Sequence, residues 1–360
     1  QGQKNKLLFW AIVLVLSGGI GNMIDRIRFN YVIDFFYNAF GTPNGHKYIR
    51  EFNCESVPTL TYRVGGVILT KEKVFISHEN RILIKYTLVE AHSPTKLQFR
   101  PFLAFRNANA LFIKPGIAIN KDIKQIENGI SCCLYKGYPD LFMQFSHKVE
   151  WVNDGHWYKG IEYFKDKDRG IPYKEDLWVP GYFEVPIKKG ESIIFSASTF
   201  ESKPRSFAKT YTDEIATRTT RTSFYNCLKN AAKQFYFKNE NGTYIMAGYP
   251  WLNIRTRDAL IALPGCTLSI EHKDDFHAIM DTILNDLNRY INSGTKENIV
   301  HEIDLPDIPL WTIWAIQQYK RTCGLTECRN RYSESVKSLI EHIINGKIRN
   351  LTLHENGLLY

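Results

Sequence analysis

The sequence lacks cysteine and histidine pairs at the spacing of a zinc site, and its seven cysteines are an odd number. The spacing argues against a metal centre, and the odd count argues against a framework of disulfides. Both features suit reduced thiols in a cytoplasmic protein, so we expect no metal and no cofactor. The thiols are Cys54, Cys132, Cys133, Cys227, Cys266, Cys323 and Cys328.

Long runs of like charge, zinc-finger patterns and Arg-Gly repeats are also missing. The formal net charge of +9 is spread along 360 residues. Because nucleic-acid-binding proteins usually gather their basic residues on one face or helix, we expect no nucleic-acid partner.

Aromatic residues, in contrast, are frequent and make up 14% of the chain. This content favours a carbohydrate partner, because sugars are held largely by the faces of aromatic rings. A chain of 360 residues also exceeds what one hydrophobic core usually serves, and 44% apolar residues can supply several cores. We therefore expect two or more domains.

The first 40 residues differ in character from the rest. Residues 7–24 carry no charge and follow Lys4 and Lys6. Such a run is about long enough for one membrane span, so it predicts a transmembrane helix and membrane association. A buried helix is the alternative.

Two motifs lie within or just after this run, Gly-Gly-Ile-Gly-Asn-Met-Ile-Asp-Arg at 18–26 and Tyr-Val-Ile-Asp-Phe at 31–35. Residues 1–40 resemble the lipoprotein signal peptidases (signal peptidase II), which are intramembrane aspartyl proteases. The resemblance implies that Asp34 is half of a catalytic pair that shares one proton. The polar residues that match the shell around that pair are Asn22, Asp25 and Arg26. The motif of the partner aspartate is missing from this sequence, so we expect no peptidase activity.

Residues 41–205 have the pattern of a β-domain. Alternating apolar runs predict short strands, and Gly, Pro and Asn separate them, which is typical of an antiparallel β-sandwich. Trp151, Trp157 and Trp178 lie among these runs, and we expect them to pack in the core rather than to form a sugar platform. The predicted strands are 63–69, 81–89, 97–105, 129–135, 141–145 and 192–198.

Residues 206–360 have a helical pattern. Residues 202–221 are polar and predict a connector between the domains. Apolar residues then recur at spacings of three and four, which predicts a series of helices compatible with an α/α toroid. The helical runs are 223–237, 276–287, 310–319 and 332–344.

Residues 248–265 place aromatic rings and a charged pair directly before an apolar helical run. Tyr249 and Trp251 can stack on the apolar face of a pyranose, and Arg257 and Asp258 offer donors and acceptors for its hydroxyls. The alternative is a core edge with a structural ion pair.

From residue 41 onward the chain resembles the bacterial and archaeal glycogen debranching enzymes (amylo-α-1,6-glucosidases). The resemblance implies a β-sandwich before an (α/α)6 barrel, the six-hairpin glycosidase fold, which is incomplete here. Glycogen or another branched α-glucan would be the partner. The segments on which this resemblance rests are 56–67, 100–106, 177–186, 248–251 with Arg257 and Asp258, and 309–311.

The resemblance also implies roles for single residues. Arg257 and Asp258 match a pair that binds the outer hydroxyls of the glucose whose bond is broken. The other matching pocket positions are Tyr249, Trp251, Asp307 and Trp311. Around the Arg257–Asp258 pair, many members of the family have Gly, Trp and Gly, whereas this chain has Asn253, Arg255 and Thr256.

The reaction implied is hydrolysis of an α-1,6-linked glucose with inversion, which needs a carboxylic acid and a second carboxylate. In the family both follow a His-Glu-Asn-Gly-Leu-Leu-Tyr segment, which stands here at 354–360. We therefore expect this chain to bind sugar without hydrolysing it. The rival interpretations are a non-catalytic carbohydrate-binding protein and a membrane peptidase. We expect the debranching part to be cytoplasmic and the whole chain to be membrane-associated if residues 7–24 insert.

Overall fold

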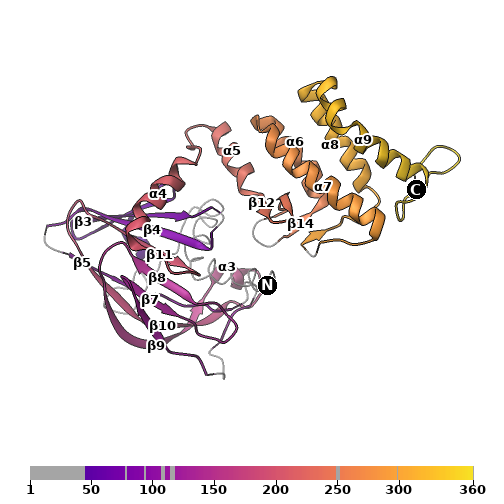
Figure 1. The fold of residues 1–360 in the computed structure, drawn as a ribbon. Coiled ribbons are helices and arrows are strands. Elements are labelled where there is room, and N and C mark those ends of the chain that lie inside the picture. The colour runs from indigo at the N-terminus through magenta and orange to yellow at the C-terminus, as the bar shows by residue number, and fades with distance from the viewer. Residues whose placement is uncertain are drawn as a thin grey trace. The chain divides into compact units, whose positions relative to one another are not determined.

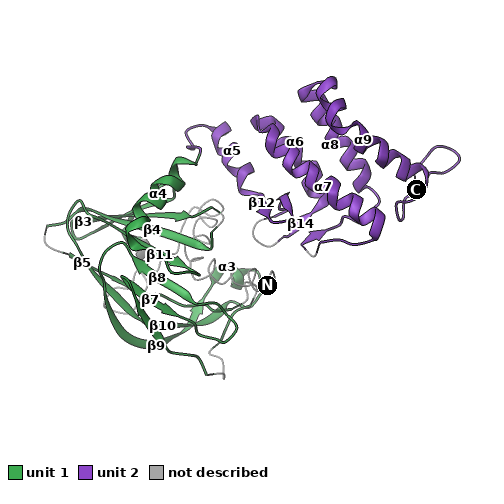
Figure 2. Ribbon diagram, in the orientation of Figure 1, with its two compact units in different colours: residues 1–218 green, residues 219–360 purple. Residues whose placement is uncertain are grey.

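The computed structural model describes residues 45–77, 79–92, 95–106, 110–113, 118–248, 252–297 and 299–359. No helix in these ranges is both long and apolar enough to cross a membrane. The predicted membrane segment at 7–24 lies outside them, as do Asn22, Asp25, Arg26 and Asp34. The chain divides into two compact units, the first ending at Arg218 and the second beginning at Thr219 (Figure 2).

The first unit consists of two antiparallel sheets (Figure 1). The larger has the strand order β1-β2-β3-β4-β11-β8-β7-β6, and the smaller has the order β5-β10-β9. The strands are β1 (Ile49–Asn53), β2 (Thr59–Val64), β3 (Val67–Phe75), β4 (Arg81–Glu90), β5 (Thr95–Phe99), β6 (Ile123–Ile126), β7 (Gly129–Cys132), β8 (Leu141–Phe145), β9 (Glu150–Glu162), β10 (Lys174–Ile187) and β11 (Ser192–Ser198). A short helix, α3 (Phe164–Asp168), separates β9 from β10.

The alternation of side chains along each strand builds one core on each face of the larger sheet. Ile82 and Ile84 of β4 face the smaller sheet and pack in the core between the sheets, which also contains Phe183 of β10. Trp178 is 5% exposed in this core, and Trp151 and Trp157 pack against it. The prediction that these tryptophans pack in the core is therefore confirmed.

The opposite face of the larger sheet is covered by α4 (Phe207–Ala216). Leu83, which lies between the two inward-facing isoleucines of β4, packs there against Phe207 and Tyr211. The boundary between the two units lies within the predicted connector at 202–221, but residues 207–216 of that stretch form this helix, because the apolar residues at positions 207 and 211 lie on one side of a helical turn.

One predicted strand was also wrong. Residues 63–69 form a hairpin, in which Val64 of β2 pairs with Val67 of β3. Gly65 and Gly66 have φ angles of +53° and +85°, which residues without a Cβ adopt readily. Two such residues form the tight turn that matches the twist of paired strands.

The second unit is mainly helical. Its helices are α5 (Phe224–Gln234), α6 (Thr256–Cys266), α7 (Lys273–Ser293), α8 (Ile308–Cys323) and α9 (Leu325–Ile344). The sequence of a β-rich unit followed by helices is confirmed, while closure into a toroid stays a prediction. Strands β12 (Tyr236–Asn239) and β13 (Gly242–Ile245) form a hairpin, and β14 (Ile254–Arg255) pairs with β15 (Val300–His301) in parallel.

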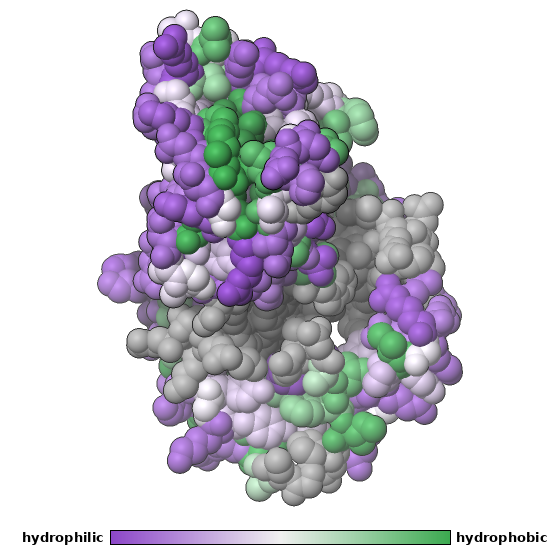
Figure 3. Space-filling view, turned by 90° about the vertical axis from the view of Figure 1, so that its right-hand side faces the viewer, coloured by the Kyte–Doolittle hydropathy of each residue, from purple (hydrophilic) through white to green (hydrophobic). Residues whose placement is uncertain are grey.

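Apolar residues from α6, α7, α8 and α9 share one core that includes Leu260, Phe276, Ile316 and Leu339. Other large apolar side chains of this unit stay exposed, among them Phe224 on α5 and Ile344 on α9. In the space-filling view, green apolar patches interrupt a largely hydrophilic face (Figure 3).

Candidate functional site

Arg257 and Asp307 are joined by two hydrogen bonds at the starts of two helices. Arg257 lies in the first turn of α6, and Asp307 directly precedes α8. The Nε and Nη2 atoms of Arg257 donate to Oδ2 and Oδ1 of Asp307 over 2.7 and 3.0 Å. Such a two-pronged contact fixes the planes of both groups, so it presents donors and acceptors in a defined orientation.

A tryptophan completes this arrangement. The indole Nε1 of Trp311 donates to Oδ2 of Asp307 over 3.1 Å, because residues four apart lie on the same face of a helix. Its ring meets Trp314 edge to face, with 5.3 Å between centroids. The site therefore combines a guanidinium, a carboxylate and an aromatic ring.

The charges of this pair reinforce each other. The hydrogen bonds from Arg257 lower the pKa of Asp307, although partial burial opposes the shift, and Asp307 in turn raises the pKa of Arg257. Both groups thus stay charged near neutral pH. Their side chains are 40% and 33% exposed, so a ligand can reach them.

Asp258 lies beside this pair without sharing in it. The sequence suggested Arg257 and Asp258 as a pair, but the carboxylate that binds the guanidinium of Arg257 is that of Asp307. Asp258 is half-buried in the first turn of α6, where a carboxylate is favoured by the helix dipole. Its oxygens make no hydrogen bond within the part of the chain that the structure describes, so they can accept from a ligand.

Tyr249 and Trp251, the other predicted pocket residues, lie outside the described residues. The residues that flank this stretch, Gly248 and Leu252, are joined by a hydrogen bond in which the backbone nitrogen of Leu252 donates to the backbone oxygen of Gly248 over 2.8 Å. The structure thus brings together Arg257, Asp307 and Trp311, with Asp258 next to them in sequence.

A second group of contacts near this site was not predicted. His301 accepts a 3.0 Å hydrogen bond from the amide of Asn253 at its Nε2, and its backbone oxygen accepts one of 3.1 Å from the hydroxyl of Thr256. Arg255 lies 3.7 Å from the carboxylate of Glu302. Each of the three residues that depart from the family pattern therefore contacts either position 301 or position 302. Those departures were the one signal in the sequence that could have pointed to this group.

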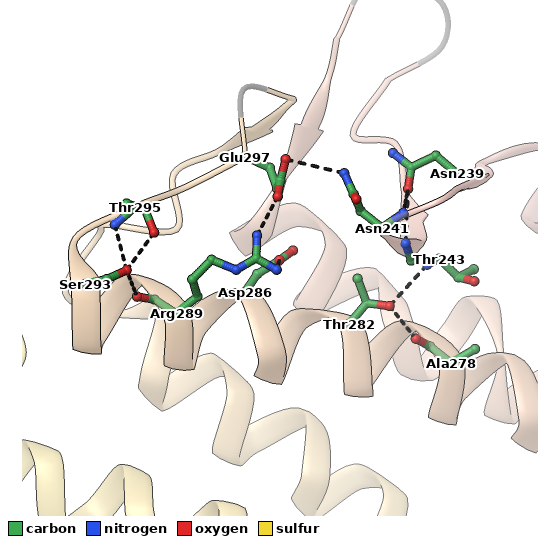
Figure 4. A network of polar contacts seen from close by, with 11 residues as sticks. Asn239, Asn241, Thr243, Ala278, Thr282, Asp286, Arg289, Ser293, Thr295 and Glu297 are labelled. Carbon is green, nitrogen blue, oxygen red and sulfur yellow. Dashed lines mark hydrogen bonds and ion pairs between the residues drawn. The ribbon is translucent and has the colours of Figure 1, made fainter. Parts of the chain in front are cut away.

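The loop that leads to these residues is anchored on α7 (Figure 4). The carboxylate of Glu297 accepts hydrogen bonds from Arg289 on α7 and from Asn241 in the β12–β13 turn. Thr282 of α7 accepts a hydrogen bond from the backbone of Thr243 over 3.1 Å. These contacts hold the hairpin and the start of the loop against one helix.

Metal binding finds no support in this part of the molecule. Across the ranges that the structure describes, no three His, Cys, Asp or Glu side chains come together in a way that could hold a metal ion. The seven cysteines are free thiols.

Three family models match the chain. Residues 29–194 match the glycogen debranching enzyme N terminal model, residues 226–360 match the amylo-alpha-1,6-glucosidase model, and residues 1–55 match the signal peptidase (SPase) II model. The first and third matches overlap at 29–55, so the debranching-type and peptidase-type sequences meet within that range.

Comparison with single proteins gives shorter or weaker matches. The chain is 52% identical over 41 residues to a lipoprotein signal peptidase of Bacillus pumilus (strain SAFR-032), covering 11% of this chain and 26% of the relative. It is 50% identical over 32 residues to that of Clostridium tetani (strain Massachusetts / E88), covering 9% and 20%. The chain thus spans about a quarter or less of the length of these relatives.

Among solved structures, a bacterial glucoamylase complexed with acarbose matches 85% of this chain and 50% of its own, with 14% identity and a TM-score of 0.39. This likeness is too weak to define the fold.

Proposed function

We propose that this chain, in which the two successive regions of a glycogen debranching enzyme follow a short lipoprotein signal peptidase segment, binds branched α-glucan at Arg257, Asp307 and Trp311. The observation that carries the proposal is the two-pronged contact between Arg257 and Asp307, with the indole of Trp311 on the same carboxylate.

The chemistry of these groups suits a neutral sugar. A pyranose has an apolar face, which can stack on an aromatic ring, and a rim of hydroxyls that both donate and accept. Arg257 has further N–H donors, and the oxygens of Asp307 have lone pairs beyond those already used. Asp258 supplies another acceptor from the same helical turn.

The positions of the helices support a double-ring arrangement in this unit. Helix α8 packs on α6 as well as on α9, although α7 lies between α6 and α8 in sequence. Contacts between alternate helices are what an inner ring of an (α/α)6 barrel requires. Since α6 and α8 both begin at the candidate site, their positive N-terminal ends lie close together there and favour the carboxylates of Asp258 and Asp307.

The parent activity of this family is the hydrolysis of α-1,6-glucosidic branch points. Hydrolysis needs a carboxyl group that is protonated near neutral pH. Asp307 does not suit that role, because Arg257 keeps its pKa low. We therefore propose that the described site holds the glucose unit and does not cut its bond.

The test is affinity electrophoresis of the purified chain in gels containing glycogen, combined with a glucose-release assay on limit dextrin. We expect glycogen to retard the chain, and Arg257→Ala to remove about tenfold or more of the affinity, as for lost hydrogen bonds to a charged group. Arg331→Ala is the control, because it breaks an ion pair of similar exposure with Asp281 on the same unit.

Each result has a defined meaning. Retardation that Arg257→Ala does not change contradicts the proposed site, and no retardation of the wild-type chain contradicts glucan binding altogether. Glucose release that depends on a carboxylate of this chain would show hydrolysis and contradict the purely binding role.

A further inference from the structure

Two segments of the chain lie side by side next to the Arg257–Asp307 pair and are joined by hydrogen bonds and an ion pair. Ile254 and Arg255 of β14 pair with Val300 and His301 of β15 as parallel neighbours. Side chains then add three contacts between the segments, from Asn253, Arg255 and Thr256 to positions 301 and 302. Arg257 follows directly on the first segment, and the second segment leads to Asp307.

Glu302 has a backbone conformation that is unfavourable for its residue type. Its φ angle is +65°, in the left-handed region that a side chain with a Cβ disfavours. Asn128 and Asn350 share this conformation, which asparagine tolerates better than most residues, and Glu271 is another glutamate that has it. A glycine would be relaxed at position 302, so a glutamate there carries a backbone cost that a glycine would not.

The side chain of Glu302 forms an ion pair with Arg255. Nη1 of Arg255 lies 3.7 Å from Oε1 of Glu302, with the two side chains 45% and 30% exposed. An ion pair as open as this contributes little to stability by itself. Its position is more telling, because it joins the residue two before Arg257 to the residue five before Asp307.

We infer that Glu302 is a positioning residue, which acts through its ion pair with Arg255 and holds Arg257 in contact with Asp307 for sugar binding. The hydrogen bonds of the neighbouring His301 to Asn253 and Thr256 support the same placement. The inference rests on the proposed function for its sugar ligand. Geometry alone supports the positioning, since rigid placement of binding groups requires a supporting set of contacts behind them.

The decisive variant is Glu302→Gly. Glycine relieves the left-handed backbone, so the midpoint of thermal unfolding should stay unchanged or rise. Loss of the carboxylate should nevertheless weaken glycogen affinity by about two- to fivefold, the range that the loss of an exposed ion pair allows. The matched control is Glu271→Gly, which changes the same residue type at a φ angle of +64° directly after the short 3-10 helix at Leu268–Ile270, and it should leave glycogen affinity unchanged.

A second readout needs no sugar. The indole N–H of Trp311 donates to Asp307, so its proton–nitrogen NMR signal, assigned with Trp311→Phe, reports the geometry of the pair. We expect this signal to shift in Glu302→Gly and to stay in place in Glu271→Gly.

The two readouts separate the possible failures. An unmoved indole signal together with wild-type affinity in Glu302→Gly overturns the inference and leaves the proposed function intact. A wild-type chain that binds no glycogen overturns the proposed function, while a shifted indole signal would still support the positioning role. Equal losses of affinity in both glycine variants would overturn the inference, because they would indicate a general effect of glycine.

Discussion

The guanidinium of Arg257 and the carboxylate of Asp307 share hydrogen bonds of 2.7 and 3.0 Å across 50 residues of sequence. The contact connects the starts of α6 and α8, and Trp311 adds a third hydrogen bond to the same carboxylate. Asp258, the neighbour of Arg257 in sequence, takes no part in it. The two aspartates should therefore respond differently to the same substitution.

Asp307→Asn should lower both glycogen affinity and thermal stability, because it weakens the hydrogen bonds of Arg257 and removes their charge. Asp258→Asn should lower glycogen affinity with a smaller loss of stability, since its carboxylate has only the helix dipole and no hydrogen-bond partner to lose within the described part of the chain. Affinity electrophoresis and thermal unfolding of the two variants provide the comparison. Equal destabilisation by both variants would refute the different roles.

The pH dependence of sugar binding follows from the same pair. Arg257 lowers the pKa of Asp307, so the charged carboxylate should persist below the ordinary aspartate value of about 3.9. The stabilisation is then present above that value and is lost as pH falls through the lower pKa of the folded state. We expect glycogen retardation to be constant from about pH 7 to about pH 4.5. A decline centred between those limits, with circular dichroism unchanged, would contradict the assignment.

The sequence predicted the elements well where local pattern decides structure. The runs at 81–89, 141–145 and 192–198 form β4, β8 and β11, and the helical run at 332–344 forms most of α9. The run at 223–237 was too long, because α5 ends at Gln234 and Tyr236 begins a hairpin strand. Aromatic residues fit a strand as readily as a helix, so the pattern alone could not locate that end.

The site was harder to predict for a physical reason. Resemblance indicated Arg257 and Asp307 separately, but no periodicity relates two residues on different helices. Their contact depends on the way α6 and α8 pack. The role of Glu302 was invisible in the sequence, since a left-handed backbone at a glutamate follows no local rule.

His277 of α7 connects three helices through its hydrogen bonds. Tyr319 donates its hydroxyl hydrogen to Glu327 over 2.5 Å, so its oxygen is left to accept from Nε2 of His277 over 3.2 Å. The other ring nitrogen, Nδ1, lies 2.8 Å from the hydroxyl of Tyr332 and accepts its hydrogen. This chain of hydrogen bonds fits a neutral imidazole.

Acid should therefore weaken the helical unit through His277. Burial is the main cause that lowers the pKa of His277, and Arg331 adds to it, while Asp281, Glu327 and Asp274 oppose the shift. The unfolded state then takes up the proton first, so stability is lost as pH falls from the ordinary histidine value of about 6.5 through the folded value. His277→Gln should flatten this slope in thermal unfolding followed by circular dichroism, whereas His147→Gln on the first unit should keep it. A slope unchanged by His277→Gln would exclude this histidine as the cause.

The exposed apolar face of α5 predicts self-association. Phe224 and Leu228 lie one turn apart on the same side of this helix and are 79% and 50% exposed. Adjacent apolar side chains of this size promote contact between copies of a protein, because association removes them from water. The chain should therefore show concentration-dependent association in sedimentation velocity, and the double variant Phe224→Gln with Leu228→Gln should reduce it without loss of helix. Phe164→Gln, at a ring 57% exposed on the first unit, is the control and should associate like the wild type. A wild-type chain that stays monomeric at all concentrations would show that this face does not drive association.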